Sequence, residues 1–397
     1  DNLSQLMVAQ NKLETPPPEI VAEGTQAIMV YMRTLKEAEM YKRLDLREMG
    51  LAFFPREICV LTMLIELSLA SNEMRTIPPD IGLLTNVTKL KVADNILVQL
   101  PKEIGDLVQL LYVDLSQNEL QYLPNEVGKW HKIIRFKADE NSLRELPASI
   151  SSWQDCVEIE VQENALRTLP RSIGLLAKLK KLVLNDCELS TFPDELFHAP
   201  VLELVHADGN QLQELPASIG RASRLNTLTL SSNKIRRLPI EIGKLRKNLK
   251  ELKLDGNPIQ APPRDVWTKG TVPTLEFCQH VLTARKKLEF IYNDRDIGTY
   301  PIDIELLVDR PPSDDGQQGP YGARKVDLSK NRIRRIPENI GANLQLEVLN
   351  LSNNLIAQLD EAIGMCSNLL DLDLSNNELP LLANRIAGLT CLTAFKV

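Results

Sequence analysis

The sequence predicts an α/β solenoid, a curved horseshoe with a parallel β-sheet on its concave face and short helical or irregular returns on its convex face. Three features indicate it: asparagines recur every 23 residues, aliphatic residues alternate with others before each asparagine, and a Leu-Pro pair follows most of them. A fixed period of about 20 to 50 residues is typical of stacked repeat units. The chain of 397 residues, 43% of them hydrophobic, is long enough to bury the core of such an array.

The unit from Leu90 to Leu107 shows one repeat, Leu-x-Val-x-x-Asn-x-Leu-x-x-Leu-Pro-x-x-Ile-Gly-x-Leu. Leu90 and Val92 share one face of a short strand, because side chains alternate along a strand, and the residues between them point the other way. Pro101 opens the return at a fixed φ. One unit cannot bury its own apolar edge, so successive units stack and their strands pair in parallel.

The recurring asparagines are expected to form a ladder through the turns that follow the strands. An amide side chain offers both donors and an acceptor to backbone groups left inside the coil. Cys187 stands 23 residues after Asn164, where the period expects asparagine, and Met49 takes that position at the start of the main block. The predicted ladder residues are Asn72, Asn95, Asn118, Asn141, Asn164, Cys187, Asn210, Asn233, Asn257, Asn331, Asn354 and Asn377.

This frame, LxxLxLxxNxLxxLPxxIGxL, resembles that of the leucine-rich repeat family, and within it the LPxxIGxLxxL subtype of the intracellular Ras-group and Ras-scaffold proteins. The resemblance covers roughly residues 3–20, 41–263 and 323–397. It implies a leucine-rich-repeat solenoid whose choice of partner depends on the variable outward positions of its strands. Asp360 and Ala383 depart from the pattern, because each stands where the frame has proline.

Two interruptions of the period divide the array into blocks. In the first, Ile28, Tyr31 and Leu35 lie at helical spacing and predict an amphipathic helix. The predicted order is the end of an upstream repeat block over 1–20, a helical insertion over 21–43, the main solenoid over 44–263, a helix plus flexible loop insertion over 264–322, and continuing repeats, truncated mid-repeat, over 323–397.

The second interruption is expected to contain a helix from about Thr274 to Tyr292. The stretch from Ile297 to Ile304 imitates half a repeat, but its phase does not match a full frame. Residues 309–322 are rich in proline, glycine and aspartate and indicate a flexible loop.

Composition and motifs narrow the function classes. The net charge of −7 disfavours nucleic acid as a partner, and no apolar run is long enough for membrane insertion. The six cysteines lie far apart, which favours a reducing compartment and a cytoplasmic location over a disulfide framework. No motif for catalysis, a metal site or a cofactor is present, so we expect neither catalytic residues, nor a metal, nor a cofactor.

The outward strand positions are the expected partner-binding surface, since the concave sheet of a solenoid is an extended binding face. Charged residues at these positions surround a group with few charges. The predicted binding residues are Arg135, Glu158, Glu160, Lys181, Val183, Leu204, His206, Thr227 and Thr229. The basic stretch 234–253 falls mostly in a return. Its positive charges are either a solvated part of the convex face or a site for an acidic partner.

We therefore expect a non-enzymatic scaffold or adaptor that binds protein partners on its concave face, with a small GTPase or a cytoskeletal assembly among the candidates. Two alternatives stay open. The chain is the regulatory or recognition arm of a larger signalling enzyme, such as a GTPase, kinase or ligase, or it is a structural component of a large cytoskeletal or ciliary assembly. The second alternative places it at the cytoskeleton or cilium.

Overall fold

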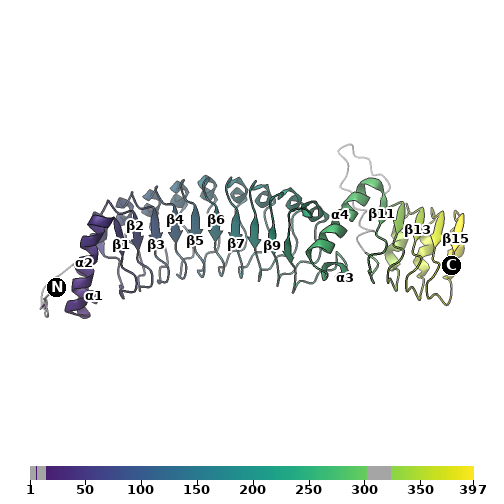
Figure 1. Cartoon of the computed structure of the whole chain (residues 1–397), viewed down its shortest axis with the longest axis horizontal. Coiled ribbons are helices and arrows are strands. Elements are labelled where there is room, and N and C mark those ends of the chain that lie inside the picture. The colour runs from purple at the N-terminus through teal and green to yellow at the C-terminus, as the bar shows by residue number, and fades with distance from the viewer. Residues whose placement is uncertain (1–5, 7–14, 302–322) are drawn as a thin grey trace. The chain divides into compact units, whose positions relative to one another are not determined.

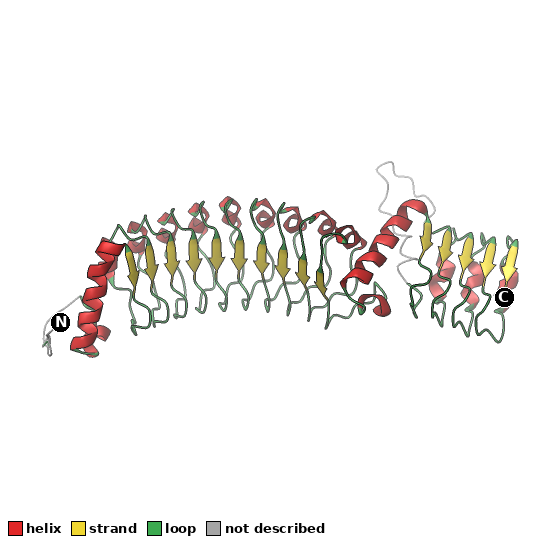
Figure 2. Cartoon of the chain, in the orientation of Figure 1, coloured by secondary structure: helices red, strands yellow, loops and turns green. Residues whose placement is uncertain are grey.

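The computed structural model describes residues 6, 15–301 and 323–397 of the chain. These residues belong to two compact units, one with residues up to 233 and 254–256, the other with 234–253 and 257–397. In each unit, short parallel strands lie side by side and 3-10 helices follow them along the chain (Figures 1 and 2). The predicted α/β solenoid with a parallel sheet and short helical returns is confirmed.

The strands of the first unit pair in chain order from β1 to β9. Every residue pairs with the one 23 positions further on, as Lys89 does with Tyr112, so the period of the sequence is the register of the sheet. The bounds are β1 Arg43–Asp45, β2 Glu66–Ser68, β3 Lys89–Lys91, β4 Tyr112–Asp114, β5 Arg135–Lys137, β6 Glu158–Glu160, β7 Lys181–Val183, β8 Leu204–His206 and β9 Thr227–Thr229.

A 3-10 helix opens each return of this unit directly after a proline. Pro124, for example, has φ −65° and precedes η4, which matches the angle that the proline ring imposes. The isoleucine or equivalent aliphatic of each helix is buried, as Ile104 is in η3. The bounds are η1 Arg56–Val60, η2 Pro79–Leu83, η3 Lys102–Asp106, η4 Asn125–Lys129, η5 Ala148–Ser152, η6 Arg171–Leu175, η7 Asp194–His198 and η8 Ala217–Arg221.

The ladder asparagines bridge neighbouring repeats. The Nδ2 of Asn95 donates to the carbonyls of Leu69, Val92 and Ala93 at 3.0, 3.2 and 3.2 Å, and its Oδ1 accepts from the Met74 amide at 3.0 Å. The same pattern recurs at the other ladder asparagines, although Asn257 is described only through its Oδ1, which accepts from the Ile235 amide at 3.0 Å. One side chain thereby satisfies buried backbone groups of two repeats.

The residue before each ladder position turns the chain through the left-handed region. Asp94 has φ 55° there, and Gly209, where glycine stands instead, has φ 68°. Any side chain except glycine is strained at such an angle, but the turn is over-determined by the ladder hydrogen bonds on either side. The tight turn after each strand therefore comes from the ladder and not from a glycine signature.

The described residues of the second unit form the α-helices α3 and α4, several 3-10 helices and a five-stranded parallel sheet in the order β11 to β15. At η12 the Asp360 side chain, which replaces proline, accepts from the Ala362 amide at 2.8 Å and caps the helix. The bounds are η9 Ile240–Leu245, β10 Glu251–Lys253, α3 Arg264–Trp267, α4 Thr271–Lys287, β11 Glu289–Ile291, β12 Lys325–Asp327, η11 Glu338–Ala342, β13 Val348–Asn350, η12 Glu361–Met365, β14 Asp371–Asp373, η13 Asn384–Gly388 and β15 Ala394–Lys396.

The helix predicted over 274–292 is wrong at its C-terminal end, because a full repeat begins there. Helix α4 stops at the left-handed Leu288, and β11 then pairs with β12. Tyr292 contributes its carbonyl to the ladder Asn331, whose Oδ1 accepts from the Arg295 and Ile297 amides. Residues 297–301, the described part of the stretch predicted to be out of phase, therefore follow the repeat frame with Arg295 in the ladder position.

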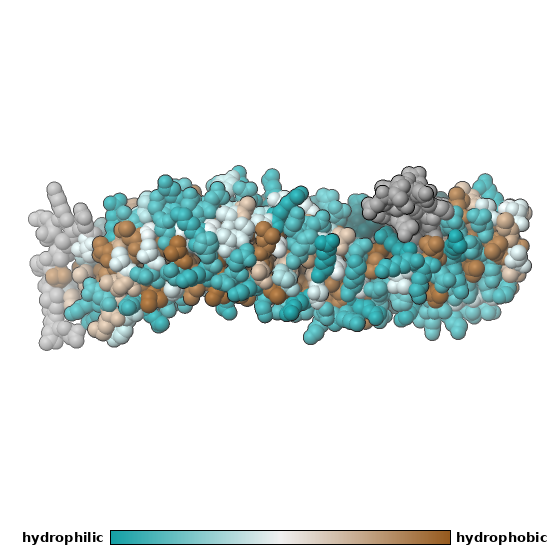
Figure 3. All heavy atoms as spheres, turned by 90° about the horizontal axis from the view of Figure 1, so that it is seen from above, coloured by the Kyte–Doolittle hydropathy of each residue, from teal (hydrophilic) through white to brown (hydrophobic). Residues whose placement is uncertain are grey.

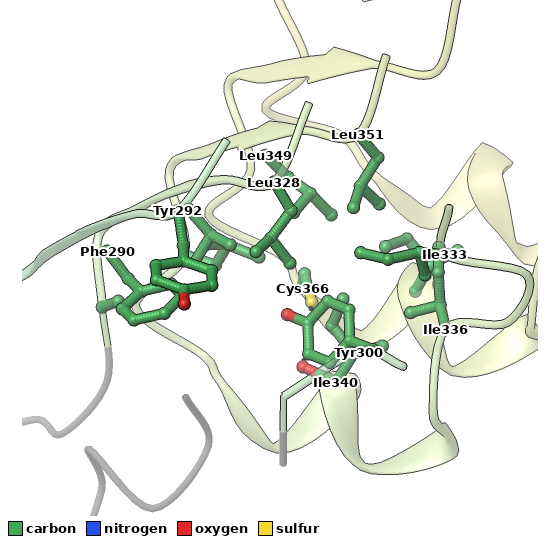
Figure 4. Close-up of a cluster of buried hydrophobic side chains, with 14 of the residues drawn as sticks. Phe290, Tyr292, Tyr300, Leu328, Ile333, Ile336, Ile340, Leu349, Leu351 and Cys366 are labelled. Carbon is green, nitrogen blue, oxygen red and sulfur yellow. Dashed lines mark hydrogen bonds between the residues drawn. The ribbon is translucent and has the colours of Figure 1, made fainter. Parts of the chain in front are cut away.

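Aromatic residues fill the core of that repeat. Phe290 and Tyr292 stack with ring centroids 5.8 Å apart, and Tyr300 lies among the isoleucines of the following repeats (Figure 4). Tyr300 with Pro301 takes the place of Leu-Pro. The frame was missed because aromatic residues and an arginine replace the leucines and the asparagine that define it elsewhere.

The helical insertions are two copies of one arrangement. Helices α1 Pro18–Ala22 and α2 Thr25–Tyr41 match α3 and α4, because corresponding elements start 246 residues apart, from 25 to 271 for the long helices and from 43 to 289 for the strands after them. Thr25 Oγ1 accepts from the Leu6 amide at 2.8 Å, and Thr271 Oγ1 accepts from the Leu252 amide at 2.9 Å. Each hydroxyl therefore accepts from a backbone amide 19 residues upstream.

The boundary between the two compact units lies after residue 233. It lies there because α4 packs on η9, and this contact assigns the repeat that contains η9 to the second unit. The predicted blocks follow the repeat register instead, and the division into them stays a prediction. The upstream repeat block predicted over 1–20 falls largely, and the loop over 309–322 wholly, outside the described residues.

Candidate protein-binding surface

A network of six charged side chains spans β5, β6 and β7 on the strand face of the first unit. Glu158 forms an ion pair with Arg135 at 3.3 Å and accepts from Lys181 at 2.5 Å. Glu160 accepts from Lys137 at 3.2 Å and also from Lys181. We call Arg135, Lys137, Asp139, Glu158, Glu160 and Lys181 the charge network.

The network is formed because each strand presents its first and third residues outward, and the 23-residue register places residues of opposite charge on adjacent strands. Four of its members, Arg135, Glu158, Glu160 and Lys181, are among the predicted binding residues. Lys137 and Asp139 were not selected, although they occupy outward positions of the same repeat. Reading the charge signs across neighbouring repeats would have found them.

Burial changes the acid–base behaviour of the network. Asp139 is 6% exposed, and this burial, with the negative charge of Glu160 nearby, raises its pKa to about 6 against the opposing effect of Lys137. Burial acts in the same direction on Glu160, but hydrogen bonds with Lys181, Glu158 and Lys137 together hold the pKa of that carboxyl below its usual range. The network therefore contains one carboxyl group that titrates near neutral pH.

The predicted residues with few charges lie beside the network on β7, β8 and β9. Their register places Lys181 next to Leu204 and Leu204 next to Thr227. We call Val183, Leu204, His206, Thr227 and Thr229 the central patch.

Two members of the central patch expose less surface than their outward positions predict. Val183 is 7% exposed and Thr229 is 2% exposed, so the expectation that both face solvent is wrong. Val183 pairs with Glu160 and His206 on its two sides, and Thr229 donates to Asp208 at 2.6 Å. Larger or hydrogen-bonded neighbours cover both side chains, which leaves Leu204, His206 and Thr227 as the part-exposed members.

The strand face also has a hollow that the sequence did not predict. It has a volume of about 200 Å³ and lies over β1, β2 and β3, where Arg43, Asp45, Arg47, Glu66 and Lys89 contribute to its lining. Arg43 and Arg47 pair with Glu66 and Asp45 at 3.4 and 2.5 Å. Four of the lining charges therefore pair with one another, whereas Lys89 lies over the Tyr112 ring at 5.7 Å.

The surface seen from above in Figure 3 is mostly hydrophilic, with apolar residues in small separate groups. Scattered apolar residues of this kind are normal on a protein surface. This view therefore gives no reason to move the candidate surface away from the strand face.

Within residues 6, 15–301 and 323–397, no group of three or more metal-binding side chains is placed to hold an ion. Burial raises the thiol pKa of Cys59 and Cys187 to about 11 and that of Cys156 to about 12, so these thiols are protonated at neutral pH and are poor nucleophiles. No helix in the described ranges has the length and apolar character needed to cross a membrane.

The comparisons with known proteins bear on the fold. No known protein family and no curated protein matches the chain. Among solved structures, a leucine-rich-repeat protein of Leptospira interrogans is similar at a TM-score of 0.53 and 27% identity, over 91% of this chain and 98% of that one. The fold is a leucine-rich-repeat solenoid.

A chain of the Toll–Spatzle complex of Drosophila is also similar, with a TM-score of 0.51 and 21% identity over 88% of this chain and 43% of that one. At this identity the likeness concerns the fold. Leucine-rich-repeat solenoids present an extended strand face to other molecules, and the outward residues of that face determine which ones.

Proposed function

We propose that this chain is a non-enzymatic scaffold that binds a protein partner on the strand face of its first unit, the concave face of such a solenoid. The contact centres on Leu204 and His206 and extends over the charge network. The proposal covers the scaffold role, the cytoplasmic location and the absence of catalysis.

One observation carries the proposal: consecutive strands β5 to β9 place a part-exposed aliphatic side chain next to a self-paired charge network. Lys181 joins the two, since it bonds both glutamates of the network and lies beside Leu204 in the sheet. An interface typically has an anchor with few charges and a polar rim. A partner that covers Leu204 gains apolar contact there and reaches charges held in place by neighbouring strands.

The first partner to test is a small GTPase, because the repeat frame resembles that of the Ras-group proteins. The six widely spaced cysteines support the cytoplasmic location. Crosslinking mass spectrometry on the native complex identifies the partner directly, and its crosslinks should fall on the strand face between β5 and β9.

The decisive variant is Leu204→Arg. It places a charge at the centre of the proposed contact and should weaken binding of the crosslinked partner by about 2 kcal/mol, near thirtyfold, if Leu204 is an interface hot spot. Stability should change by less than about 0.5 kcal/mol, because Leu204 is part-exposed at an outward strand position.

The matched control is Leu175→Arg, the same change at an aliphatic residue that is 63% exposed on η6. This variant should leave the partner bound. If Leu175→Arg abolishes binding and Leu204→Arg does not, the helical face is the working surface and the proposal is wrong.

A further inference from the structure

A hollow of about 520 Å³ lies between η9 and α4 in the second unit, away from the strand face. Lys244, Arg246 and Lys247 line one side of it. The other side is formed by the neutral side chains of α4 that face it, Gln279, His280 and Thr283. Its size is within the range of about 300 to 1,000 Å³ typical of small-molecule sites.

The three cations of this hollow have no carboxylate partner. Within the described ranges, no Asp or Glu lies at ion-pair distance from Lys244, Arg246 or Lys247, and no acidic residue contributes to the lining. Three positive charges therefore lie together in the hollow. Their mutual repulsion is a cost that a bound anion would remove.

In the returns of the first unit, comparable lysines form ion pairs with carboxylates. Lys129 on η4 pairs with Asp106 of the preceding repeat at 2.8 Å, and Lys178 pairs with Asp155 at 2.7 Å. A carboxylate 23 residues upstream therefore neutralises these lysines. Helix α4 packs on η9 in place of another return, and the α4 residues that line the hollow carry no carboxylate.

Helix α4 is held against η9 at close range, so the hollow has a fixed wall. A Cβ added at Gly243 would clash with the backbone nitrogen of Gln279, so only glycine fits there. The single carboxylate of α4, Glu276, is engaged by Arg295 at 3.7 Å. The last turn of α4 adds Arg285, Lys286 and Lys287 and no acidic residue.

The α4 wall adds one hydrogen-bond donor next to the cations, the second N–H of Gln279 Nε2. The first N–H donates to Thr283 Oγ1 at 3.2 Å, and Thr283 Oγ1 donates to the Gln279 carbonyl at 2.8 Å. His280 Nδ1 lies 2.8 Å from the Glu276 carbonyl and donates to it. Amide and guanidinium groups are donors that bind phosphate oxygens.

We propose that this hollow binds a small soluble anion that carries two or more phosphate groups. Arg246 would bind one phosphate through two parallel hydrogen bonds, and Lys244 and Lys247 would neutralise the remaining charge. The corresponding helix α2 cannot do the same, because Glu37 stands 246 residues before Thr283 and places a negative charge on that wall.

The test is isothermal titration of the full chain with inorganic pyrophosphate at about 0.15 M salt, where weak surface attraction is screened. We expect saturable binding of one anion per chain. The double variant Arg246→Gln with Lys247→Gln should bind at least about tenfold more weakly, since each lost charged hydrogen bond costs about a factor of ten. These exposed residues are not required for folding, which circular dichroism checks.

The matched control is Arg334→Gln with Arg335→Gln, which removes two exposed cations of the same unit from outside the hollow. Unchanged affinity in this control, with weakened binding in the first variant, supports the site. No saturable binding by the unmodified chain, or equal weakening by both variants, overturns it. Capture by vesicles that contain phosphatidylinositol bisphosphate, without binding of pyrophosphate, overturns the soluble ligand in favour of a membrane surface.

Discussion

Replacing Cys187 by asparagine should stabilise the first unit. Cys187 occupies a ladder position and is 5% exposed, but its thiol makes only long contacts to the carbonyls of Val161 and Asn185, at 3.4 and 3.6 Å. At the ladder positions on either side, Asn164 and Asn210 accept from the amides of Leu143 and Leu189 at 2.9 and 3.0 Å.

The amide at the corresponding position here is that of Leu166, which is fully buried. Within the described ranges, this amide has no hydrogen-bond acceptor. An asparagine at 187 would supply an acceptor to Leu166 and stronger donors to the two carbonyls. The local backbone already has the required geometry, because it matches that of the neighbouring repeats.

The magnitude follows from these contacts. A new hydrogen bond to a buried group contributes about 0.5 to 1.5 kcal/mol net, and the desolvation of the incoming amide offsets part of the gain. We expect about 1 kcal/mol of added stability, which for a unit of this size raises Tm by about 2 to 4 °C. Urea unfolding and amide exchange measure it, with slower exchange of the Leu166 amide as the local signature.

The matched control is Cys156→Asn. Cys156 is fully buried but lies outside the ladder, and among the described residues its thiol donates only to the Glu158 carbonyl, at 3.5 Å. A buried amide there would leave most of its polar groups unpaired and should cost about 1 to 3 kcal/mol. The reasoning is wrong if Cys187→Asn is no more stable than the original chain and the Leu166 amide exchanges at the same rate. The ladder side chains would then not stabilise the unit by accepting from buried backbone amides.

Two further predictions concern the first unit. Asn164→Ala should destabilise it by about 1 to 3 kcal/mol in urea unfolding, because the Leu143 amide loses its acceptor; unchanged stability would count against the ladder. Asp139→Asn should remove a pH dependence: the pKa near 6 in the folded state lies above the unfolded value, so the folded state holds the proton more tightly and stability falls as pH rises from about 4 to 6. The free energy of unfolding of the variant, relative to that of the original chain, should therefore be about 1 to 2 kcal/mol higher at pH 7 than at pH 4. The same difference between the two proteins at both pH values would contradict this.

Much of the fold was predictable because the sequence pattern of each repeat specifies its own strand, turn and return. The spacing of 23 between asparagines became the strand register, as the pairing of Leu90 with Val113 shows. Regular spacing has this power since each unit meets only its neighbours, so one frame specifies every interface between repeats. The repeat with Arg295 at its ladder position escaped because its aromatic residues fill the same core volume with different side chains.

The candidate site was predictable only as a set of outward positions. That Arg135, Glu158, Glu160 and Lys181 lie together follows from alternation and register. That Val183 and Thr229 are covered does not, because burial depends on the size of side chains on adjacent strands.

The sequence by itself determined the solenoid, the order of its strands and the residues that face outward, since all three depend on a short period that each unit repeats. Only the tertiary structure decided which outward residues keep their surface, which charges pair, and that α4 leaves Lys244, Arg246 and Lys247 without a carboxylate. These features depend on contacts between residues about 20 to 40 positions apart. No local sequence pattern specifies these features, because each depends on which distant residue the fold places next to the side chain.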